Sequence, residues 1–539
     1  MSYKQFLIVI SLALFASGCA VSDQEVTLGT SEEDTLIIGI ESEADVLDPH
    51  AGNGWVTMRI NHQMYETLVA QDLTKSSEAA PIPELIPGLA ESWEVSEDGK
   101  TYTFALREQV QFHDGTPFNA DAVQFNIKRL TDPSFDYYYQ TGASRSFRTW
   151  LYFESSEVID DSTIKIHLSE PFREFPRLLA LSNSLQIVSP TAIETYGNEG
   201  LANHPTGTGP FRFEERNRGE NINIIKNDQY WGDPAQLDRV IFRPLSDPAS
   251  RVLAIRNDEV DIIAVPPADS LANFEEDGWN VVSGKPPHVW YMNFNFDNPI
   301  MQDKRVRQAM NYAIDREGIA EELLRGSVTP AYTMQTRGHA GYDSSRRWYE
   351  YNPEKAKSLL KEAGYENGFE TTIETSIDGS GQLVPVDIME WIQRDLASVG
   401  IEATIDSSEW ISYFAGFSNG MEEQVGMNQM SSGRTSPFWL AMVAHSSFSA
   451  PGGFNSGKYI NDEVDQVLNA ASFEENHEES LRLWAEAEQL IMEDAAFIPV
   501  LNDTAPYVVH PRVQNFIIPS EEWYDLSIVS IDHRLELSK

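Results

Sequence analysis

Basic residues, cysteine and long apolar runs are all scarce in this sequence. Its 39 Lys and Arg residues stand against 83 Asp and Glu residues, which gives a formal net charge of -44. Since nucleic-acid binding needs clustered cations that neutralise phosphates, this balance excludes a nucleic-acid partner. A single cysteine excludes an intramolecular disulfide and every multi-cysteine zinc motif. No segment has the ~18 consecutive apolar residues of a transmembrane helix, so no membrane span is predicted.

Motifs of catalysis are also missing. The sequence contains no H-E-x-x-H, no G-x-S-x-G, no Walker A loop and no G-x-G-x-x-G. Residues 358–361 (SLLK) match S-x-x-K, but they lie in a predicted helix and lack the partner motifs. The eleven histidines form no metal-spaced pair. We therefore expect no enzyme, no cofactor and no metal site. A hydrolase or peptidase that uses a cleft is the alternative of a different class, and turnover of a peptide library would reveal it.

The N-terminus has the pattern of a secretory signal. Lys4 precedes an apolar run over residues 6–15, and the small residues 16–18 (ASG) lead directly to Cys19. This run is too short to span a bilayer, and its end resembles a bacterial lipobox, in which the cysteine is lipidated. We expect an exported, periplasmic or otherwise extracytoplasmic protein that Cys19 anchors to the membrane. An ordinary cleavable signal with an incidental cysteine is the alternative.

Short strands alternate with amphipathic helices along the 539 residues, which predicts an α/β protein of more than one lobe. Residues 303–325, for example, place apolar side chains at helical spacing after Asp303, a residue type that favours a helix N-terminus. Predicted helices cover residues 59–68, 303–325, 352–364, 384–398, 461–471 and 477–494, and a further helix is predicted to begin near Asn119 or Asp121. Predicted strands cover residues 34–40, 101–106, 164–168, 222–225, 239–242 and 401–405. Residues 93–95 and 101–106, joined by a turn at 98–99 (DG), are predicted to form a hairpin.

Residues 426–460 are rich in Gly, Ser, Asn, Met and aromatic residues and poor in charge. This composition is typical of a pocket wall with aromatic surface and a few hydrogen-bonding groups. It fits an ordinary buried loop equally well.

Several motifs together resemble the family 5 extracellular solute-binding proteins of ABC importers, the group with peptide, nickel and opine receptors. Each motif alone is weak, but their order and spacing along the mature chain are specific. They are LDPH at 47–50, YETLV at 65–69, LAESW at 89–93, FHDGTPFNADAV at 112–123, PTGTGPF at 205–211, NDQYW at 227–231 and RVRQAMNYAID at 305–315.

The resemblance implies a type II, Venus-flytrap architecture with an extra subdomain in the first lobe. Two chain crossings, over residues 288–295 and 497–507, are expected to form the hinge, and the ligand to bind between the lobes. The expected segments are a signal peptide at 1–18, the lipidated cysteine and tether at 19–33, lobe 1 at 34–290 plus 500–539 with the subdomain near 66–180, and lobe 2 at 291–499.

The expected ligand depends on where this sequence departs from its relatives. In peptide-binding relatives, an Asp of the second lobe pairs with the peptide's amino group. That position falls on Gly433 here, within MSSGR at 430–434, and its neighbour is Arg434. A guanidinium repels an ammonium group and favours a carboxylate or phosphate. The resemblance thus assigns Arg434 to an anionic ligand group.

Further ligand-binding candidates follow from the resemblance. Nickel receptors of the family carry arginines near the stretch 181–185, where this sequence has LSNSL, but His445 lies where they place a histidine. The remaining candidates are Trp55, Arg145, Trp439 and Met430. For each of the ligand-binding candidates, a structural role in a loop, a salt bridge or the core is the alternative interpretation.

We accordingly predict a monomeric, non-catalytic receptor that delivers a peptide or similar small organic solute to an ABC permease. Receptors for a nickel chelate, an opine or a saccharide are the alternatives within the family. A sensory or chaperone-like adaptor is a third possibility of another class.

Overall fold

A computed structural model describes residues 34–52, 54–379 and 381–535. Its N-proximal sheet has seven strands in the order β12-β19-β11-β1-β10-β9-β8. β1 pairs in parallel with both β10 and β11, so the predicted first strand is central. The strands are β1 (Thr35–Ile40), β8 (Phe211–Asn217), β9 (Asn221–Lys226), β10 (Arg239–Pro244), β11 (Ile262–Ala264), β12 (Asn280–Ser283) and β19 (Pro506–Val509).

Helices cover both faces of this sheet. One apolar core joins strand residues such as Ile38 to Ile60 of α1 and Ile193 of α5, and a second joins Ile263 to Ile255 of α6 and Phe274 of α7. Burying each such side chain contributes about 2 kcal/mol. The helices are α1 (Trp55–Met64), α5 (Pro190–Gly200), α6 (Pro248–Arg256) and α7 (Leu271–Glu276), with short η1 (Leu201–Asn203), η2 (Ala268–Ser270), β20 (Val513–Gln514) and β21 (Ser530–Ile531).

A four-stranded sheet in the order β4-β5-β7-β6 lies in the segment between α1 and α5. The predicted hairpin is present, since β4 and β5 pair antiparallel. Of the two residues predicted as the cap of the next helix, Asn119 and Asp121, it is Asn119 that begins α2, because its side chain accepts the Ala122 N–H. The elements are β2 (Val69–Gln71), β3 (Leu85–Pro87), β4 (Ala90–Val95), β5 (Thr101–Leu106), β6 (Phe153–Asp160), β7 (Thr163–Leu168), α2 (Ala120–Thr131), α3 (Gln140–Ser146) and α4 (Phe175–Leu179).

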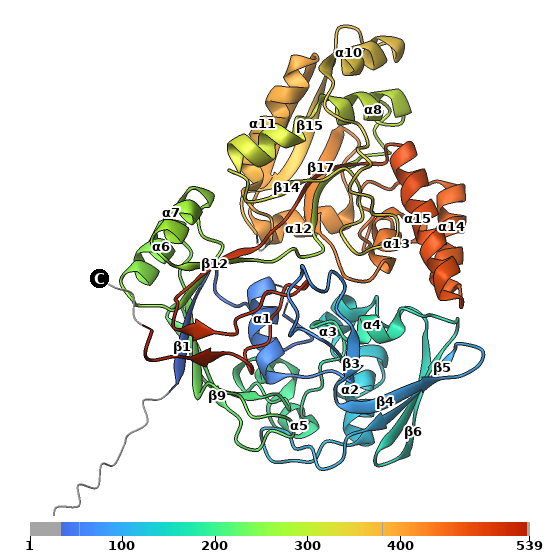
Figure 1. Ribbon diagram of the computed structural model, residues 1–539. Coiled ribbons are helices and arrows are strands. Elements are labelled where there is room, and N and C mark those ends of the chain that lie inside the picture. The colour runs from blue at the N-terminus through green and yellow to red at the C-terminus, as the bar shows by residue number, and fades with distance from the viewer. Residues whose placement is uncertain (1–33, 53, 380, 536–539) are drawn as a thin grey trace, which may run out of the picture. The chain divides into compact units, whose positions relative to one another are not determined.

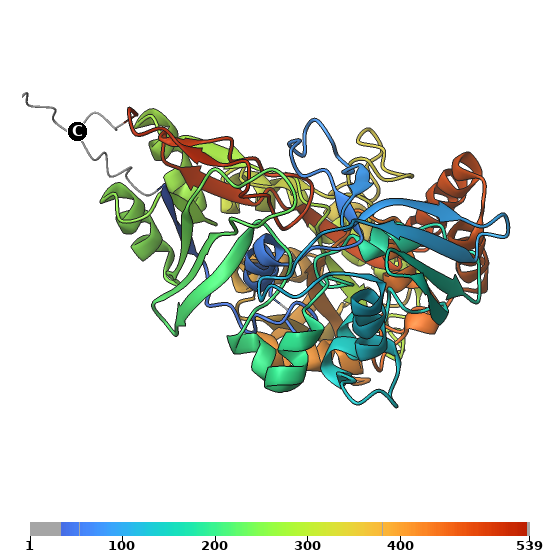
Figure 2. The ribbon, with the colours of Figure 1, turned by 90° about the horizontal axis from the view of Figure 1, so that it is seen from below.

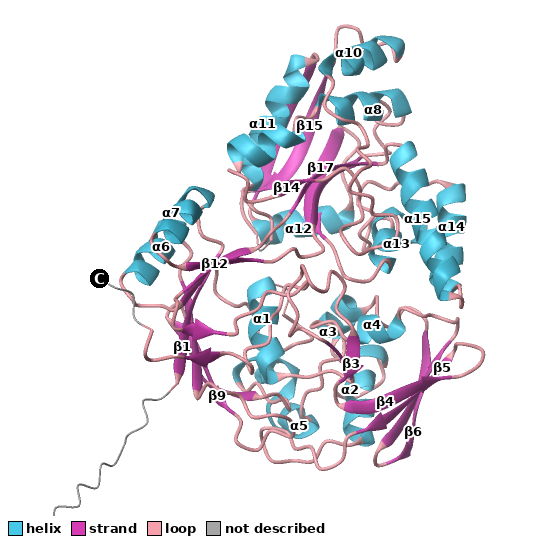
Figure 3. Ribbon diagram, in the orientation of Figure 1, coloured by secondary structure: helices cyan, strands magenta, loops and turns pink. Residues whose placement is uncertain are grey.

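The remaining large sheet has six strands in the order β14-β18-β13-β17-β15-β16. Figures 1 and 3 show α8, α10 and α11 beside it, and residues such as Met310, Leu360 and Ile392 share its core. The strands are β13 (Val289–Phe294), β14 (Thr329–Pro330), β15 (Phe369–Ser376), β16 (Ile401–Ser408), β17 (Val425–Ser432) and β18 (Phe497–Asn502). The helices are α8 (Lys304–Ala313), α9 (Arg316–Gly318), η3 (Ile319–Leu323), α10 (Pro353–Glu362), α11 (Pro385–Ser398), α12 (Trp410–Asn419), α13 (Phe438–Ala444), η4 (Ser446–Phe448), α14 (Asp462–Phe473) and α15 (His477–Glu493).

We call the part built on the seven- and four-stranded sheets the first lobe, and the part built on the six-stranded sheet the second lobe. The chain passes between the two large sheets twice, from β12 to β13 and from β18 to β19. A further contact lies away from these crossings, where α14 meets α15. Figures 1 and 2 place this turn beside the four-stranded sheet, and the Arg173 guanidinium donates to the carbonyl of Glu475 there, 2.5 Å away.

The α/β prediction is confirmed, but two predicted helices have other limits. The helix predicted over residues 303–325 is interrupted: α8 ends at Ala313, Ile314 is extended, and Asp315 begins α9 by accepting the Gly318 N–H. The prediction was wrong because Asp315 acts as an internal N-cap. The helix predicted at 59–68 is α1, which begins at Trp55 and ends at Met64 because Tyr65 is extended.

Candidate functional site

Arg434 and Trp55 meet where the two lobes contact each other. Arg434 follows β17 of the second lobe, Trp55 begins α1 of the first, and the guanidinium lies 5.1 Å from the centre of the indole ring. Trp55 also packs against His288, with ring centres 4.9 Å apart. The structure therefore brings together two residues that the sequence singled out. A cation over an indole ring is favourable by about 0.5–2 kcal/mol.

Arg434 is half-buried and has no carboxylate partner among the described residues. The hydrogen bond recorded for its side chain goes to the carbonyl oxygen of its neighbour Gly433, at 2.7 Å. Burial lowers the pKa of Arg434, while the more distant Glu521 and Glu522 carboxylates oppose this effect. A guanidinium with unused donors at a lobe contact is suited to bind a carboxylate.

Gly433 is fixed by a close approach of the backbone. A Cβ atom at this position would lie 1.5 Å from the carbonyl oxygen of Pro287 and 3.1 Å from the Cα of His288. No side chain fits there without displacing the crossing from β12 to β13. The aspartate of peptide-binding relatives therefore has no room at the position to which the resemblance assigned it.

The loop between β15 and α11 packs against the same tryptophan. A Cβ atom on Gly381 would lie 2.5 Å from Trp55 Nε1, so only glycine lets this loop approach the indole so closely. Buried Gln382 holds the loop in place, because its amide donates to the carbonyl of Ser431 and its own carbonyl accepts the Trp290 indole N–H. Sequence reasoning missed Gln382, since it lies in no recognisable motif.

Arg145 lies on α3 in the first lobe and is half-buried. Its Nη1 atom is buried without a hydrogen-bond partner among the described residues. Burial lowers the pKa of Arg145, and the nearby Asp45 and Asp48 carboxylates partly offset this effect. The side chain therefore keeps unused donors, as a ligand-binding arginine does.

Two hydroxyl groups after Arg434 join the lobes. Thr435 Oγ1 donates to Glu521 Oε1 at 2.5 Å, and Ser436 Oγ donates to Glu174 Oε2 at 2.8 Å. Gln71 also donates to Glu521, at 2.7 Å. Burial raises the pKa of Glu521 to about 6. The residues that follow Arg434 thus hold the lobes against each other by side-chain contacts.

The other predicted ligand residues lie elsewhere. Met430 and Trp439 are 2% and 4% exposed within an apolar core, and the Trp439 ring meets Tyr291 edge to face. His445 follows α13, and its Nδ1 atom accepts the Ser447 N–H. The same Nδ1 atom lies 3.8 Å from Asp465 Oδ1. No described contact joins these three residues to Arg434. Cys19 lies outside the described residues.

The described residues hold no group of three or more His, Cys, Asp or Glu side chains placed to bind a metal ion. Within residues 34–535, apart from 53 and 380, no helix is both long and apolar enough to cross a membrane.

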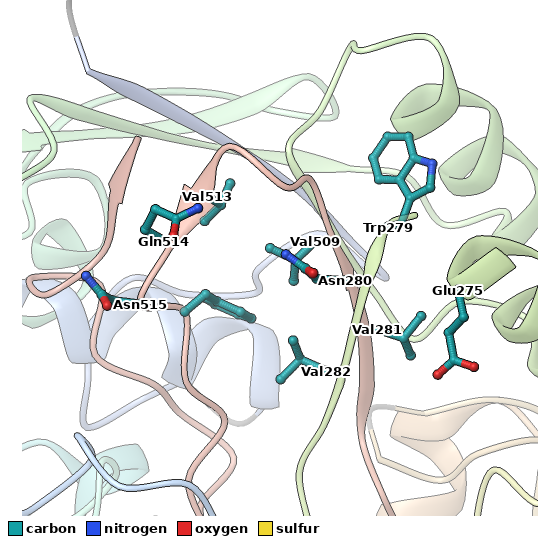
Figure 4. A pocket seen from close by; sticks show the side chains of 10 residues that line it. Glu275, Trp279, Asn280, Val281, Val282, Val509, Val513, Gln514 and Asn515 are labelled. Carbon is teal, nitrogen blue, oxygen red and sulfur yellow. The ribbon is translucent and has the colours of Figure 1, made fainter. Parts of the chain in front are cut away.

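An open surface hollow of about 470 Å³ lies at the edge of the seven-stranded sheet, and Figure 4 shows the side chains that line it. Its lining includes Trp279, Asn280, Val509 and Phe516, and none of the residues predicted for ligand binding. A hollow that is wide open to solvent encloses little of a small solute and is therefore a poor binding site. The contact between Arg434 and Trp55 is therefore the better candidate.

Two α/β lobes, two chain crossings and an aromatic, cationic contact between the lobes define a two-lobed solute-binding protein. The sequence profile of the bacterial extracellular solute-binding proteins of family 5 (middle domain) matches residues 84–448. The chain belongs to this family, the solute-binding components of ABC importers.

Individual proteins agree with this assignment. The chain is 30% identical to the glutathione-binding protein GsiB of Escherichia coli K12 over 501 residues, and this alignment covers 91% of each chain. The structure of DppA from Helicobacter pylori in complex with the peptide STSA matches with a TM-score of 0.81 and 26% identity, over 92% of this chain and 98% of the other. AgaA of Agrobacterium tumefaciens R10 in complex with agropinic acid matches with a TM-score of 0.78 and 27% identity, over 93% and 99% of the chains. The two-lobed fold that the resemblance implied is confirmed.

Proposed function

We propose that this protein captures a peptide-like solute with a carboxylate group between its two lobes and passes it to an ABC permease. The observation that carries the proposal is Arg434, a cation with unused donors that touches Trp55 of the opposite lobe. A ligand carboxylate supplies the partner that the described protein residues do not. The aromatic surface of Trp55 packs against the apolar part of the solute.

The names of related proteins support this ligand class. GsiB is a glutathione-binding protein, and DppA was solved with a peptide. AgaA was solved with agropinic acid. An uncharged saccharide, in contrast, cannot form an ion pair with Arg434, so the charge at this position favours an acid.

Binding is proposed to close the two lobes. We place the first lobe at residues 34–290 plus 500–539, with its subdomain near 66–180, and the second at 291–499. Only a closed arrangement lets Arg434 and Trp55 contact one ligand together, so the ligand shifts the population toward closure. Arg145 belongs to the first-lobe wall in this proposal, and His445, Trp439 and Met430 to the second-lobe wall or its support.

The proposal includes a lipid anchor at Cys19, cleavage before this residue and a monomeric, non-catalytic mature protein. The residues 16–19 (ASGC) support the anchor. Mass spectrometry of the mature N-terminus tests it: a diacylated or triacylated Cys19 is expected, and an unmodified Cys19 or cleavage elsewhere contradicts it. Cys19→Ser is expected to release the protein from the membrane fraction.

Native mass spectrometry of the protein from its own host tests the ligand site. The wild-type chain is expected to carry a small solute with at least one carboxyl group, and Arg434→Ala to lose it. Arg482→Ala is the matched control, since Arg482 lies exposed on α15 and pairs only with neighbouring glutamates. Retention of the solute by Arg434→Ala, or a solute without a carboxyl group, contradicts the proposal.

A further inference from the structure

A second arginine of the first lobe reaches the second lobe. Arg148 follows α3, and its guanidinium lies 4.9 Å from the ring centre of Phe454 and 5.7 Å from that of Phe147. Phe454 belongs to the second lobe, between α13 and α14. Arg148 therefore spans the contact between the lobes from the first-lobe side, as Arg434 does from the second.

Arg148 has no hydrogen bond and no ion pair among the residues that the structure describes. Burial lowers its pKa to about 9, and the positive charge of Arg434 is the second cause. The two guanidinium groups thus repel each other, and no described residue forms an ion pair with either of them. Such an arrangement costs free energy unless an anion accompanies it.

Composition does not explain this lack of partners, because acids outnumber bases by more than two to one. Among the buried arginines of the described residues, three are paired: Arg59 with Glu41 at 2.7 Å, Arg129 with Asp48 at 2.6 Å and Arg307 with Asp494 at 2.9 Å. The other two, Arg251 and Arg316, donate to several backbone carbonyls instead. At the contact between the lobes, the Arg148 side chain has neither kind of partner in the part of the chain that the structure describes, and Arg434 donates to a single carbonyl. This placement is what an anion-binding surface requires.

A row of aromatic rings on the second lobe connects the two arginines. From Phe454 the row continues to Phe414, with ring centres 6.3 Å apart, and on to Trp410 at 5.4 Å. A Cβ atom on Gly379 would lie 2.7 Å from Trp410, so the β15–α11 loop, which also touches Trp55, packs on this ring. An elongated solute can thus lay its apolar part along the rings while its charged groups reach the arginines.

We propose that Arg148 is a specificity-determining residue and that the ligand carries two carboxylates, one bound by Arg434 and the other by Arg148. This inference rests on the proposed function and extends it from a carboxylate-bearing to a dicarboxylate, peptide-like solute. Arg145, three residues earlier, adds positive charge to the first-lobe side. It is the weaker second site, since Asp45 and Asp48 lie near it.

Calorimetric titration with matched probes tests the inference. The probes are reduced glutathione, which has two carboxylates, and its two mono-amides, each of which lacks one. Wild-type protein is expected to bind glutathione at least about tenfold more tightly than either mono-amide. Arg148→Ala is expected to lose the preference over one mono-amide, and Arg434→Ala the preference over the other.

Controls separate this inference from the proposed function. Arg148→Gln repeats the test with a longer polar side chain, and unchanged circular dichroism and melting temperature verify folding. Arg394→Ala is the matched control, because Arg394 also lies over a ring, Trp391 at 4.6 Å, but on the exposed surface of α11. An Arg148→Ala variant that keeps both preferences overturns the inference alone. An Arg434→Ala variant that keeps both preferences overturns the proposed function as well. A wild-type protein that binds none of the probes contradicts both the inference and the proposed function.

Discussion

Single residues decide which ligands this protein can hold, and Gly433 is the clearest case. The backbone of Pro287 fills the space that a side chain at this position needs. The neighbouring Arg434 therefore determines the charge of the site, and a substitution at 433 cannot restore an acidic group without moving the crossing between the lobes. Ligand specificity here has two sources: the fold excludes an acidic side chain at position 433, and Arg434 attracts an anionic group of the ligand.

Gly433→Ala is expected to destabilise the protein by about 1–3 kcal/mol or more, because the added Cβ overlaps backbone atoms. Chemical unfolding followed by fluorescence measures the change. Gly416→Ala is the control: its Cβ meets no atom within 4 Å, and it lies on α12 at an exposed position, so it should be neutral or stabilising by up to about 1 kcal/mol. Equal stability of the Gly433→Ala variant and wild type contradicts the close approach.

Glu488 makes the stability depend on pH. It is 2% exposed on α15, accepts the Met334 N–H at 2.8 Å, and burial raises its pKa to about 7 from 4.5. The folded state favours the protonated acid, so its contribution is complete below about pH 4.5 and is lost as the pH rises through 7. The loss is about 3 kcal/mol.

Glu488→Gln is therefore expected to flatten the fall in unfolding free energy between pH 4.5 and 7. Urea titrations at several pH values measure it, and Glu493→Gln, at an exposed position of the same helix, should leave the slope unchanged. Parallel curves for wild type and Glu488→Gln would falsify the assignment.

At the scale of elements, the segment between β17 and α13 combines recognition with closure. It carries Arg434, and directly afterwards Thr435 and Ser436 bind carboxylates of the first lobe. These two contacts favour the closed lobes whether or not a ligand is bound. A ligand then needs to supply only the remaining free energy of closure.

A Thr435→Val/Ser436→Ala variant is expected to open more readily without ligand and to bind its ligand at least about a hundredfold more weakly. The reason is that each lost hydrogen bond to a charged group contributes about 1.5–3 kcal/mol to the closed state, so that the two together contribute about 3 kcal/mol or more. Small-angle X-ray scattering measures the radius of the free protein, and calorimetry the affinity. Ser446→Ala is the control, since Ser446 bonds Asp465 within the second lobe. An unchanged radius and affinity count against this role.

The elements also show how far the sequence predicts the structure. Local signals predicted α2 and α10, whose caps at Asn119 and Asn352 lie next to the chain they organise. A local pattern gave a wrong prediction at 303–325, where the apolar spacing of one long helix continues past the cap at Asp315 that begins a second helix. Arg148 could not be found in this way, because its role depends on Phe454, which is distant in sequence. Arg434 was predicted only because a family motif marks its position.

At the scale of the whole molecule, the charge of -44 acts through repulsion between exposed carboxylates. Salt screens this repulsion, since the Debye length falls from about 10 Å at 0.1 M to about 3 Å at 1 M. The melting temperature is expected to rise between about 0.05 M and 1 M NaCl, with KCl giving the same gain. No gain in either salt contradicts a destabilising role of the net charge.

The net negative charge of the molecule also affects which solutes the site between the lobes can bind. The chain as a whole carries a net negative charge, while Arg434 and Arg148 lie where the lobes meet. An anionic solute is repelled by the net charge of the protein and attracted by these two guanidinium groups. The protein as a whole therefore selects against anions that do not reach both lobes.

Calorimetric titration of a peptide acid against its amide tests the central claim most directly. Wild-type protein is expected to bind reduced glutathione more tightly than its diamide by a factor of about ten or more, and Arg434→Ala to show a smaller preference, because only the carboxylate assigned to Arg148 then distinguishes the two probes. Equal affinity of wild type for the acid and the diamide, or a preference in Arg434→Ala as large as in wild type, contradicts the claim that this guanidinium recognises a carboxylate between the lobes.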